Sequence, residues 1–155
     1  VLCDFHTEFK IKSGVSTVQY EAEHGTKKFW EFINDQGLSF WSEMTPMQDM
    51  EELKSFVFDN FLRIGILSSS SKKNGSVHAD AGKRLWLQKY NFSSQISDND
   101  IIIVDSAKDK QIYAKPGRIL VDDYEKNINS WRAKGGIGIK HVNANKTIKE
   151  LYKYV

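Results

Sequence analysis

Two adjacent aspartates, Asp122 and Asp123, follow directly after a short apolar run at residues 119–121. A short β-branched run of this kind is typical of a buried strand in a parallel sheet, and open α/β sheets place their chemistry at the carboxyl ends of strands. Two like charges side by side are costly unless a cation offsets them, and Mg²⁺ shared between carboxylates and substrate phosphate oxygens is the usual solution. The alternative is that the two acids cap the helix that follows, where acids are also favoured.

Lysines and serines elsewhere in the chain could bind the same anionic ligand. Lys108 and Lys110 precede the acid pair, and a lysine holds a phosphate as a point charge. Another apolar run, residues 63–67, leads into Ser68 and Ser69, and hydroxyls and backbone N–H groups at the end of a strand suit an anion. The alternative for this serine-rich stretch is a flexible, solvated loop.

The composition limits the classes of protein that the chain can belong to. Its 155 residues are 40% hydrophobic and 27% charged, which is typical of one globular domain. The 22 basic and 20 acidic residues give a net charge of +2, so neither a nucleic-acid polymer nor a membrane is expected as partner. The single cysteine, Cys3, excludes an internal disulfide and a cysteine zinc cluster and favours a cytoplasmic location.

Apolar periodicity predicts how the chain positions these groups. Short apolar runs predict strands at residues 63–67, 101–104, 119–121 and 137–139, and helical spacing predicts helices at residues 26–34, 47–57, 81–90, 127–134 and 148–155. Alternation of strands and helices argues for an α/β fold with a doubly wound parallel sheet. The segment at about residues 15–46 is rich in aromatic residues and lacks strand-like runs, so we expect a small helical insertion there.

The stretch from Lys110 to Asp122 and Asp123, followed by Trp131 and the glycine-rich residues 135–139, resembles the C-terminal half of the haloacid-dehalogenase-like phosphatases. Within that superfamily it is most similar to the 5′(3′)-deoxyribonucleotidases and their bacterial and phage relatives. The resemblance implies one domain over residues 1–155, with a three-layer Rossmann-like parallel sheet and a helical cap inserted at about residues 15–46.

The order of the motifs supports the same resemblance. The tripeptide ending at Ser68 is similar to the second motif of the superfamily, a strand that ends in Ser or Thr. The order of Ser68, then Lys110, then the acid pair is that of the superfamily. A response-regulator receiver domain uses similar residue types, but there the acid pair comes first and the lysine last.

The beginning of the chain resembles part of the first motif. In this family an Asp-x-Asp-Gly sequence is followed closely by Leu-x-Asp-Phe, and residues 1–5 resemble the portion after the glycine. The resemblance therefore implies that the nucleophilic aspartate, the second acid and their strand lie upstream of Val1. The alternative is that Asp4 is the nucleophile with His6 in the place of the second acid, although three preceding residues are few for a central strand.

The resemblance assigns roles to the candidate residues. It implies a Mg²⁺-dependent phosphatase that hydrolyses (deoxy)ribonucleoside monophosphates through an aspartyl-phosphate intermediate. Asp122 is the expected metal ligand. Asp123 is expected either to support Asp122 from behind or to link it to the lysine. Lys110 is the expected catalytic lysine and also binds phosphate, together with the Ser68 hydroxyl and the Ser69 N–H.

Aromatic residues complete the expected site. Phe5, Phe40 and Trp41 resemble the family's aromatic wall against the nucleobase or sugar, and a flat ring can stack on a base. The alternative is that all three are ordinary core residues. Two other functions remain open: a catalytically inactive relative that binds nucleotide or phosphate, and a phosphatase for another small phosphate ester. Whether the chain forms a homodimer is also open.

Overall fold

The computed structural model describes residues 1–155, and the chain divides into two compact units. The first comprises Val1–Leu2, Pro46–Ile64 and Ala107–Val155, and the second comprises Cys3–Thr45 and Gly65–Ser106. We call the first the acid-pair unit, since it contains Asp122 and Asp123, and the second the serine unit, since it contains Ser68 and Ser69. The boundaries of the expected single domain and of its cap stay a prediction.

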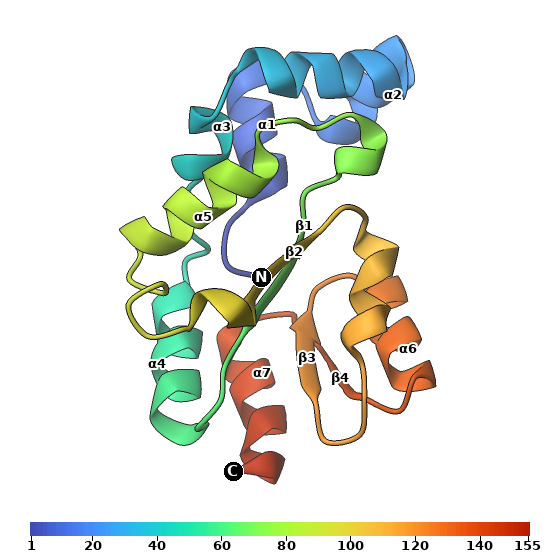
Figure 1. Ribbon diagram of the computed structural model, residues 1–155. Helices are drawn as coiled ribbons and strands as arrows, with labels where there is room; N and C mark the ends of the chain where they lie inside the picture. The colour runs from blue at the N-terminus through green and yellow to red at the C-terminus, as the bar shows by residue number, and fades with distance from the viewer. The chain divides into compact units, whose positions relative to one another are not determined.

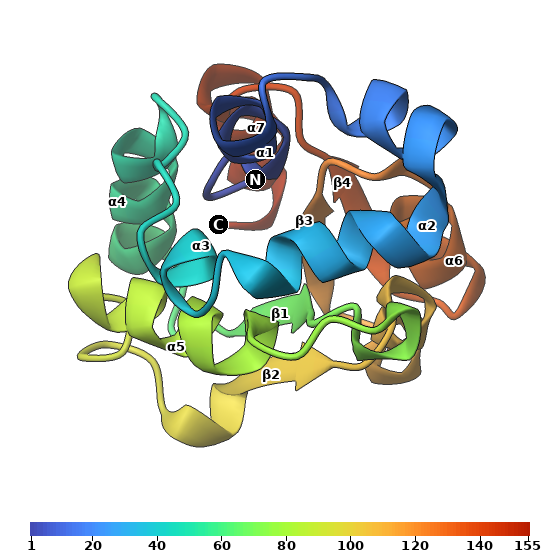
Figure 2. The same cartoon turned by 90° about the horizontal axis from the view of Figure 1, so that it is seen from above.

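The serine unit combines helices with one pair of parallel strands. Its elements are α1 (Phe5–Ser13), α2 (Thr17–Asp35), α3 (Ser39–Ser42), β1 (Ile66–Ser69), η1 (Lys72–Asn74), α5 (Ala79–Lys89), η2 (Asp98–Asp100) and β2 (Ile101–Val104). The pairing of β1 with β2 runs from Ile66 opposite Ile101 to Ser69 opposite Val104, and Figure 2 shows the two strands side by side. Parallel pairing needs a long crossover, which η1, α5 and η2 supply.

The acid-pair unit contains a second parallel pair. Its elements are α4 (Met50–Asn60), η3 (Ala107–Tyr113), β3 (Ile119–Asp122), α6 (Glu125–Ala133), β4 (Ile137–Lys140), α7 (Ala144–Leu151) and η4 (Tyr152–Tyr154). The pairing of β3 with β4 runs from Ile119 opposite Ile137 to Asp122 opposite Lys140. Helix α6 is the crossover and lies beside the strands (Figure 1), so β3, α6 and β4 form a βαβ unit.

Two glycines allow α6 to pack closely on β4. A Cβ atom added at Gly136 would collide with the Trp131 indole, and one at Gly138 would lie 3.0 Å from the Ile128 Cγ2 atom. Ile128 and Trp131 are buried on the strand-facing side of α6. This packing holds α6 close against β4.

The core of the serine unit is largely aromatic. Phe9 stacks on Phe29 with ring centroids 4.8 Å apart, and Trp41 and Trp86 are also buried. Helix α5 approaches α3 closely at Gly82, where a Cβ atom would lie 3.1 Å from the Leu38 carbonyl oxygen and would collide with Trp41. Because the two helices approach closely, Lys83, the residue after Gly82 in α5, lies over the Trp41 ring.

The structure confirms the α/β class, with strands that are parallel and connected through helices. The strands form two separate pairs, so one continuous Rossmann-like sheet stays a prediction. None of the helices combines the length and apolar character needed to cross a bilayer.

Several predicted boundaries were wrong, and two of the differences have a clear physical reason. The strand expected at residues 63–67 lies at Ile66–Ser69, because the serines continue the ladder opposite Ile103 and Val104. The helix expected from residue 26 begins nine residues earlier, where the Ser16 side chain accepts a hydrogen bond from the Gln19 N–H. Gly25, with φ of 83°, interrupts that helix, which is why the pattern predicted only its second half.

Candidate functional site

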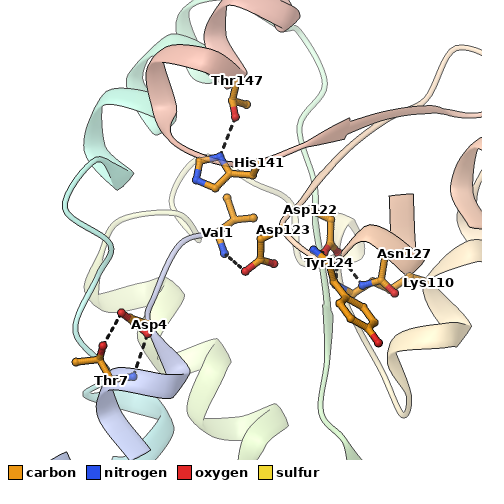
Figure 3. Close-up of polar contacts among 10 residues, drawn as sticks. All are labelled: Val1, Asp4, Thr7, Lys110, Asp122, Asp123, Tyr124, Asn127, His141 and Thr147. Carbon is orange, nitrogen blue, oxygen red and sulfur yellow. Dashed lines mark hydrogen bonds and ion pairs between the residues drawn. The ribbon is translucent and has the colours of Figure 1, made fainter. Parts of the chain in front are cut away.

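The side chain of Asp122 is buried at the end of β3 and accepts three hydrogen bonds (Figure 3). Its Oδ2 atom lies 2.7 Å from Lys110 Nζ and 3.0 Å from Asn127 Nδ2. Its Oδ1 atom accepts a hydrogen bond of 2.8 Å from the Tyr124 N–H. The side chains of Asp122 and Lys110 are only 5% and 14% exposed, so the two residues form a buried ion pair.

The contacts of Asp122 decide its protonation state. Burial by itself raises the pKa of this carboxyl group, because a low-dielectric surrounding disfavours the charge. The positive charge of Lys110 and the hydrogen bonds from Lys110, Tyr124 and Asn127 outweigh burial, so the pKa lies below its usual value. Asp122 is therefore an anion at neutral pH.

Asp123 has a different environment from its neighbour. Its side chain is 67% exposed, and the backbone nitrogen of Val1 lies 3.8 Å from its Oδ2 atom. Neither acid is the N-cap residue of α6, because the N-cap is Tyr124, whose side chain makes no capping hydrogen bond. The lysine thus binds the first acid of the pair, and the second faces solvent.

In the serine unit, Ser68 and Ser69 lie at the end of β1 and contact a lysine from α5. Lys83 Nζ donates hydrogen bonds to Ser68 Oγ at 3.0 Å and to the Ser69 carbonyl oxygen at 2.5 Å. The same ammonium lies 5.2 Å from the centroid of the Trp41 ring. A hydroxyl and a cation at the end of a parallel strand are suitable donors for a phosphate oxygen.

Sequence reasoning missed Lys83. It follows Ser68 by 15 residues and carries no local motif that separates it from the other lysines. Helical periodicity places it on a helix after the serine-rich stretch, but only the close packing of α5 on α3 brings it to β1.

The serine-rich loop after β1 binds its own backbone. Ser69 Oγ accepts from the Ser71 N–H at 3.2 Å, and Ser70 Oγ accepts from the Lys72 N–H at 3.3 Å. Ser70 Oγ also donates to the Val104 carbonyl oxygen at 3.2 Å. These hydroxyls therefore define the loop conformation, and Ser68 is the serine that pairs with the lysine.

The three aromatic residues expected at the site contact one another. Phe5 stacks on Trp41 with centroids 5.6 Å apart and meets Phe40 edge-on at 5.7 Å. Phe40 is fully buried, as the core interpretation expects, whereas Phe5 is half-buried. The Trp41 Nε1 atom is buried without a hydrogen-bond acceptor. Contact of Phe5 and Trp41 with a ligand stays a prediction.

Asp4 caps a helix. It is the N-cap of α1, and its carboxylate accepts hydrogen bonds from the Thr7 N–H at 3.0 Å and the Thr7 hydroxyl at 2.7 Å. The hydrogen bond from the Thr7 hydroxyl is the main reason that the pKa of Asp4 lies below its usual value. This cap accounts for Asp4 without a catalytic role.

The structure thus brings Lys110 and Asp122 together in one unit, and Ser68, Ser69 and the aromatic residues in the other. Their convergence on one ligand stays a prediction. No group of three or more His, Cys, Asp or Glu side chains has an arrangement that could hold a metal ion. The chain matches no protein-family model and no curated protein sequence.

His141 follows β4 and is buried next to the acid pair. Its backbone N–H donates to the Asp122 carbonyl oxygen at 2.9 Å, and its Nδ1 atom lies 2.8 Å from Thr147 Oγ1. Its Nε2 atom is buried without a partner. Burial of the ring is the main reason that its pKa lies below the ordinary value. Two acids, Asp49 and Asp123, oppose the effect of burial.

We expect His141 to make stability depend on pH. Because its pKa is lower in the folded state, its contribution is complete above the unfolded value of about 6.5 and is lost as the pH falls below it. In urea unfolding between pH 5.5 and 7.5, His141→Gln should show a shallower pH dependence than the wild type. His24→Gln, which replaces an exposed histidine, controls for the substitution itself. An unchanged slope in His141→Gln would contradict the assignment.

Proposed function

We propose that the chain belongs to a Mg²⁺-dependent phosphatase of the haloacid-dehalogenase-like type that hydrolyses (deoxy)ribonucleoside monophosphates. The observation that carries the proposal is the buried ion pair of Lys110 and Asp122 at the carboxyl end of β3. These residues are 12 positions apart, and the resemblance expects a lysine and an acid of this kind at one phosphate site. The exposed Asp123 beside them supplies a second carboxylate.

The phosphate would be bound from the end of β1. The Ser68 hydroxyl and the Lys83 ammonium, 3.0 Å apart, offer a neutral donor and a charged donor to its oxygens. Charge that develops on a transferring phosphoryl group is best stabilised by donors already held in place.

Asp122 and Asp123 differ in how well their carboxylate oxygens could bind a hard cation such as Mg²⁺. Asp122 already accepts from Lys110 and Asn127 through Oδ2 and from the Tyr124 N–H through Oδ1. Asp123 faces solvent, so its oxygens suit Mg²⁺ better, and we exchange the roles that the resemblance implied for the two acids. Bound Mg²⁺ would neutralise phosphate charge and polarise the phosphoryl group.

The nucleophile is expected on a strand that precedes Val1. The backbone nitrogen of Val1 lies 3.8 Å from the Asp123 carboxylate, so residues joined to it would begin beside the acid pair. Both β1–β2 and β3–β4 are two-stranded, so each offers unpaired strand edges to a further parallel strand.

The proposed reaction has two steps. The upstream aspartate attacks phosphorus and forms an acyl-phosphate, while a second acid protonates the leaving sugar oxygen. Water then hydrolyses the acyl-phosphate. Phe5 and Trp41 would contact the base or sugar, and the helices that carry them would help to exclude water from the reaction.

The experiment is phosphate release by a longer chain that includes the residues encoded before Val1. A panel of 5′- and 3′-nucleoside monophosphates and non-nucleotide phosphate esters should be assayed with Mg²⁺ and with EDTA. We expect release from nucleoside monophosphates that depends on Mg²⁺. Nucleotide binding without release would instead favour an inactive relative, and release from other esters alone would favour a different phosphatase of the same type.

A further inference from the structure

Asn127 makes a buried polar contact that the proposed reaction does not yet use. It lies in the first turn of α6, and only 8% of the residue is exposed. Its Nδ2 atom donates to Asp122 Oδ2 at 3.0 Å, the same oxygen that lies 2.7 Å from Lys110 Nζ. Figure 3 shows the amide and the carboxylate facing one another.

This contact is not a helix cap. An N-cap side chain usually binds a free backbone N–H group, but the N-cap of α6 is Tyr124, and its side chain makes no such bond. The Asn127 amide instead points at a carboxylate outside its own helix. Its buried donor would lose that partner if Asp122 turned away, and a buried donor without an acceptor is unfavourable.

Donors on both carboxylate oxygens restrict rotation of the Asp122 side chain. The Tyr124 N–H binds Oδ1, while Lys110 and Asn127 bind Oδ2. Of these donors, Lys110 is on the most flexible side chain, so the position of its ammonium depends on where Oδ2 is held. A neutral amide can hold Oδ2 without neutralising either charge of the ion pair.

We propose that Asn127 is a positioning residue that fixes the orientation of Asp122 and, through it, the ammonium of Lys110. The effect of Asn127 on catalysis rests on the proposed function, whereas the effect of Asn127 on the ion pair of Asp122 and Lys110 does not. Asn127 touches neither substrate nor metal in this scheme and acts only through Asp122.

The test uses two substitutions at Asn127 and the same two at a control position. Asn127→Leu keeps a similar volume but removes the donor, and Asn127→Asp keeps the shape but replaces the donor by a carboxylate. Asn129 is exposed on the same helix, so Asn129→Leu and Asn129→Asp control for effects on α6 itself. Backbone amide spectra establish whether each variant is folded.

The first readout is the NMR signal of the Lys110 ammonium, assigned by its absence in Lys110→Met. We expect an ordered, slowly exchanging signal in the wild type and a broadened or lost signal in Asn127→Leu. In Asn127→Asp a second carboxylate replaces the donor beside Asp122 Oδ2 and competes for the ammonium, so the Lys110 signal should shift from its wild-type position. This variant keeps the inference testable if Asn127→Leu does not fold.

The second readout is catalysis by the longer chain. Misplacement of a catalytic group commonly costs one to two orders of magnitude, so kcat should fall about tenfold in Asn127→Leu while KM changes less than about twofold. A Lys110 signal that matches the wild type in both Asn127 variants would overturn the inference. If the longer chain hydrolyses no substrate, the proposed function fails, while the NMR readouts still decide the role of Asn127.

Discussion

Replacing Asp122 by asparagine is expected to lower the free energy of unfolding by about 3–5 kcal/mol, the usual cost of removing one partner of a buried ion pair. The loss is large because Lys110, whose side chain is 14% exposed, keeps its charge and loses its counterion. The hydrogen bonds from the Tyr124 N–H and the Asn127 amide are weakened as well. Urea unfolding at pH 7 measures the effect.

The neighbouring acid is the control. Asp123→Asn changes a side chain that is 67% exposed, and such surface substitutions usually stay within about 0.5 kcal/mol. Adding Lys110→Met to Asp122→Asn should recover part of the loss, because the unpaired charge is then removed. Equal stabilities of Asp122→Asn and Asp123→Asn would contradict the buried ion pair.

The pH dependence of the stability of Asp122→Asn follows from the lowered pKa of Asp122 in the wild type. A carboxyl group with a lowered folded pKa contributes stability above its unfolded value of about 3.9, and the contribution is lost as the pH falls toward the folded pKa. Asp122→Asn should therefore lose less stability than the wild type when the pH is lowered below about 4.

Replacing Lys83 by methionine is expected to lower kcat/KM of the longer chain for nucleoside monophosphates by about 100-fold, the effect of removing one preorganised donor. The ammonium lies 3.0 Å from Ser68 Oγ at the end of β1, where the phosphate would bind. Methionine keeps much of the apolar stem beside Trp41, so the unit should remain folded. Phosphate release with Mg²⁺ at several substrate concentrations measures the change.

Lys89 is the matched control for Lys83. It lies on the same helix, is exposed, and has its ammonium 5.7 Å from the Tyr90 ring. Lys89→Met should leave kcat/KM within about twofold, since charges remote from a site act weakly through salt-screened water. A Lys83→Met enzyme as active as Lys89→Met would show that the lysine beside Ser68 only stabilises the fold.

The sequence by itself determined the local elements and one long-range contact. Short β-branched runs predicted the strands of both parallel pairs, because burial on both faces of a strand requires such runs. It also offered Lys108 and Lys110 as partners of the acid pair, of which the resemblance selected Lys110, and Lys110 Nζ lies 2.7 Å from Asp122 Oδ2.

Tertiary structure decided which acid binds the lysine and which other residues take part. Side chains alternate along a strand, so Asp122 at the end of β3 is buried while the next residue, Asp123, faces solvent. Lys83 reaches Ser68 only because Gly82 lets α5 pack tightly on α3. Asn127 meets Asp122 only because α6 folds back along β3 and β4. Such contacts depend on how helices pack against strands and on one another, which apolar periodicity along the chain does not specify.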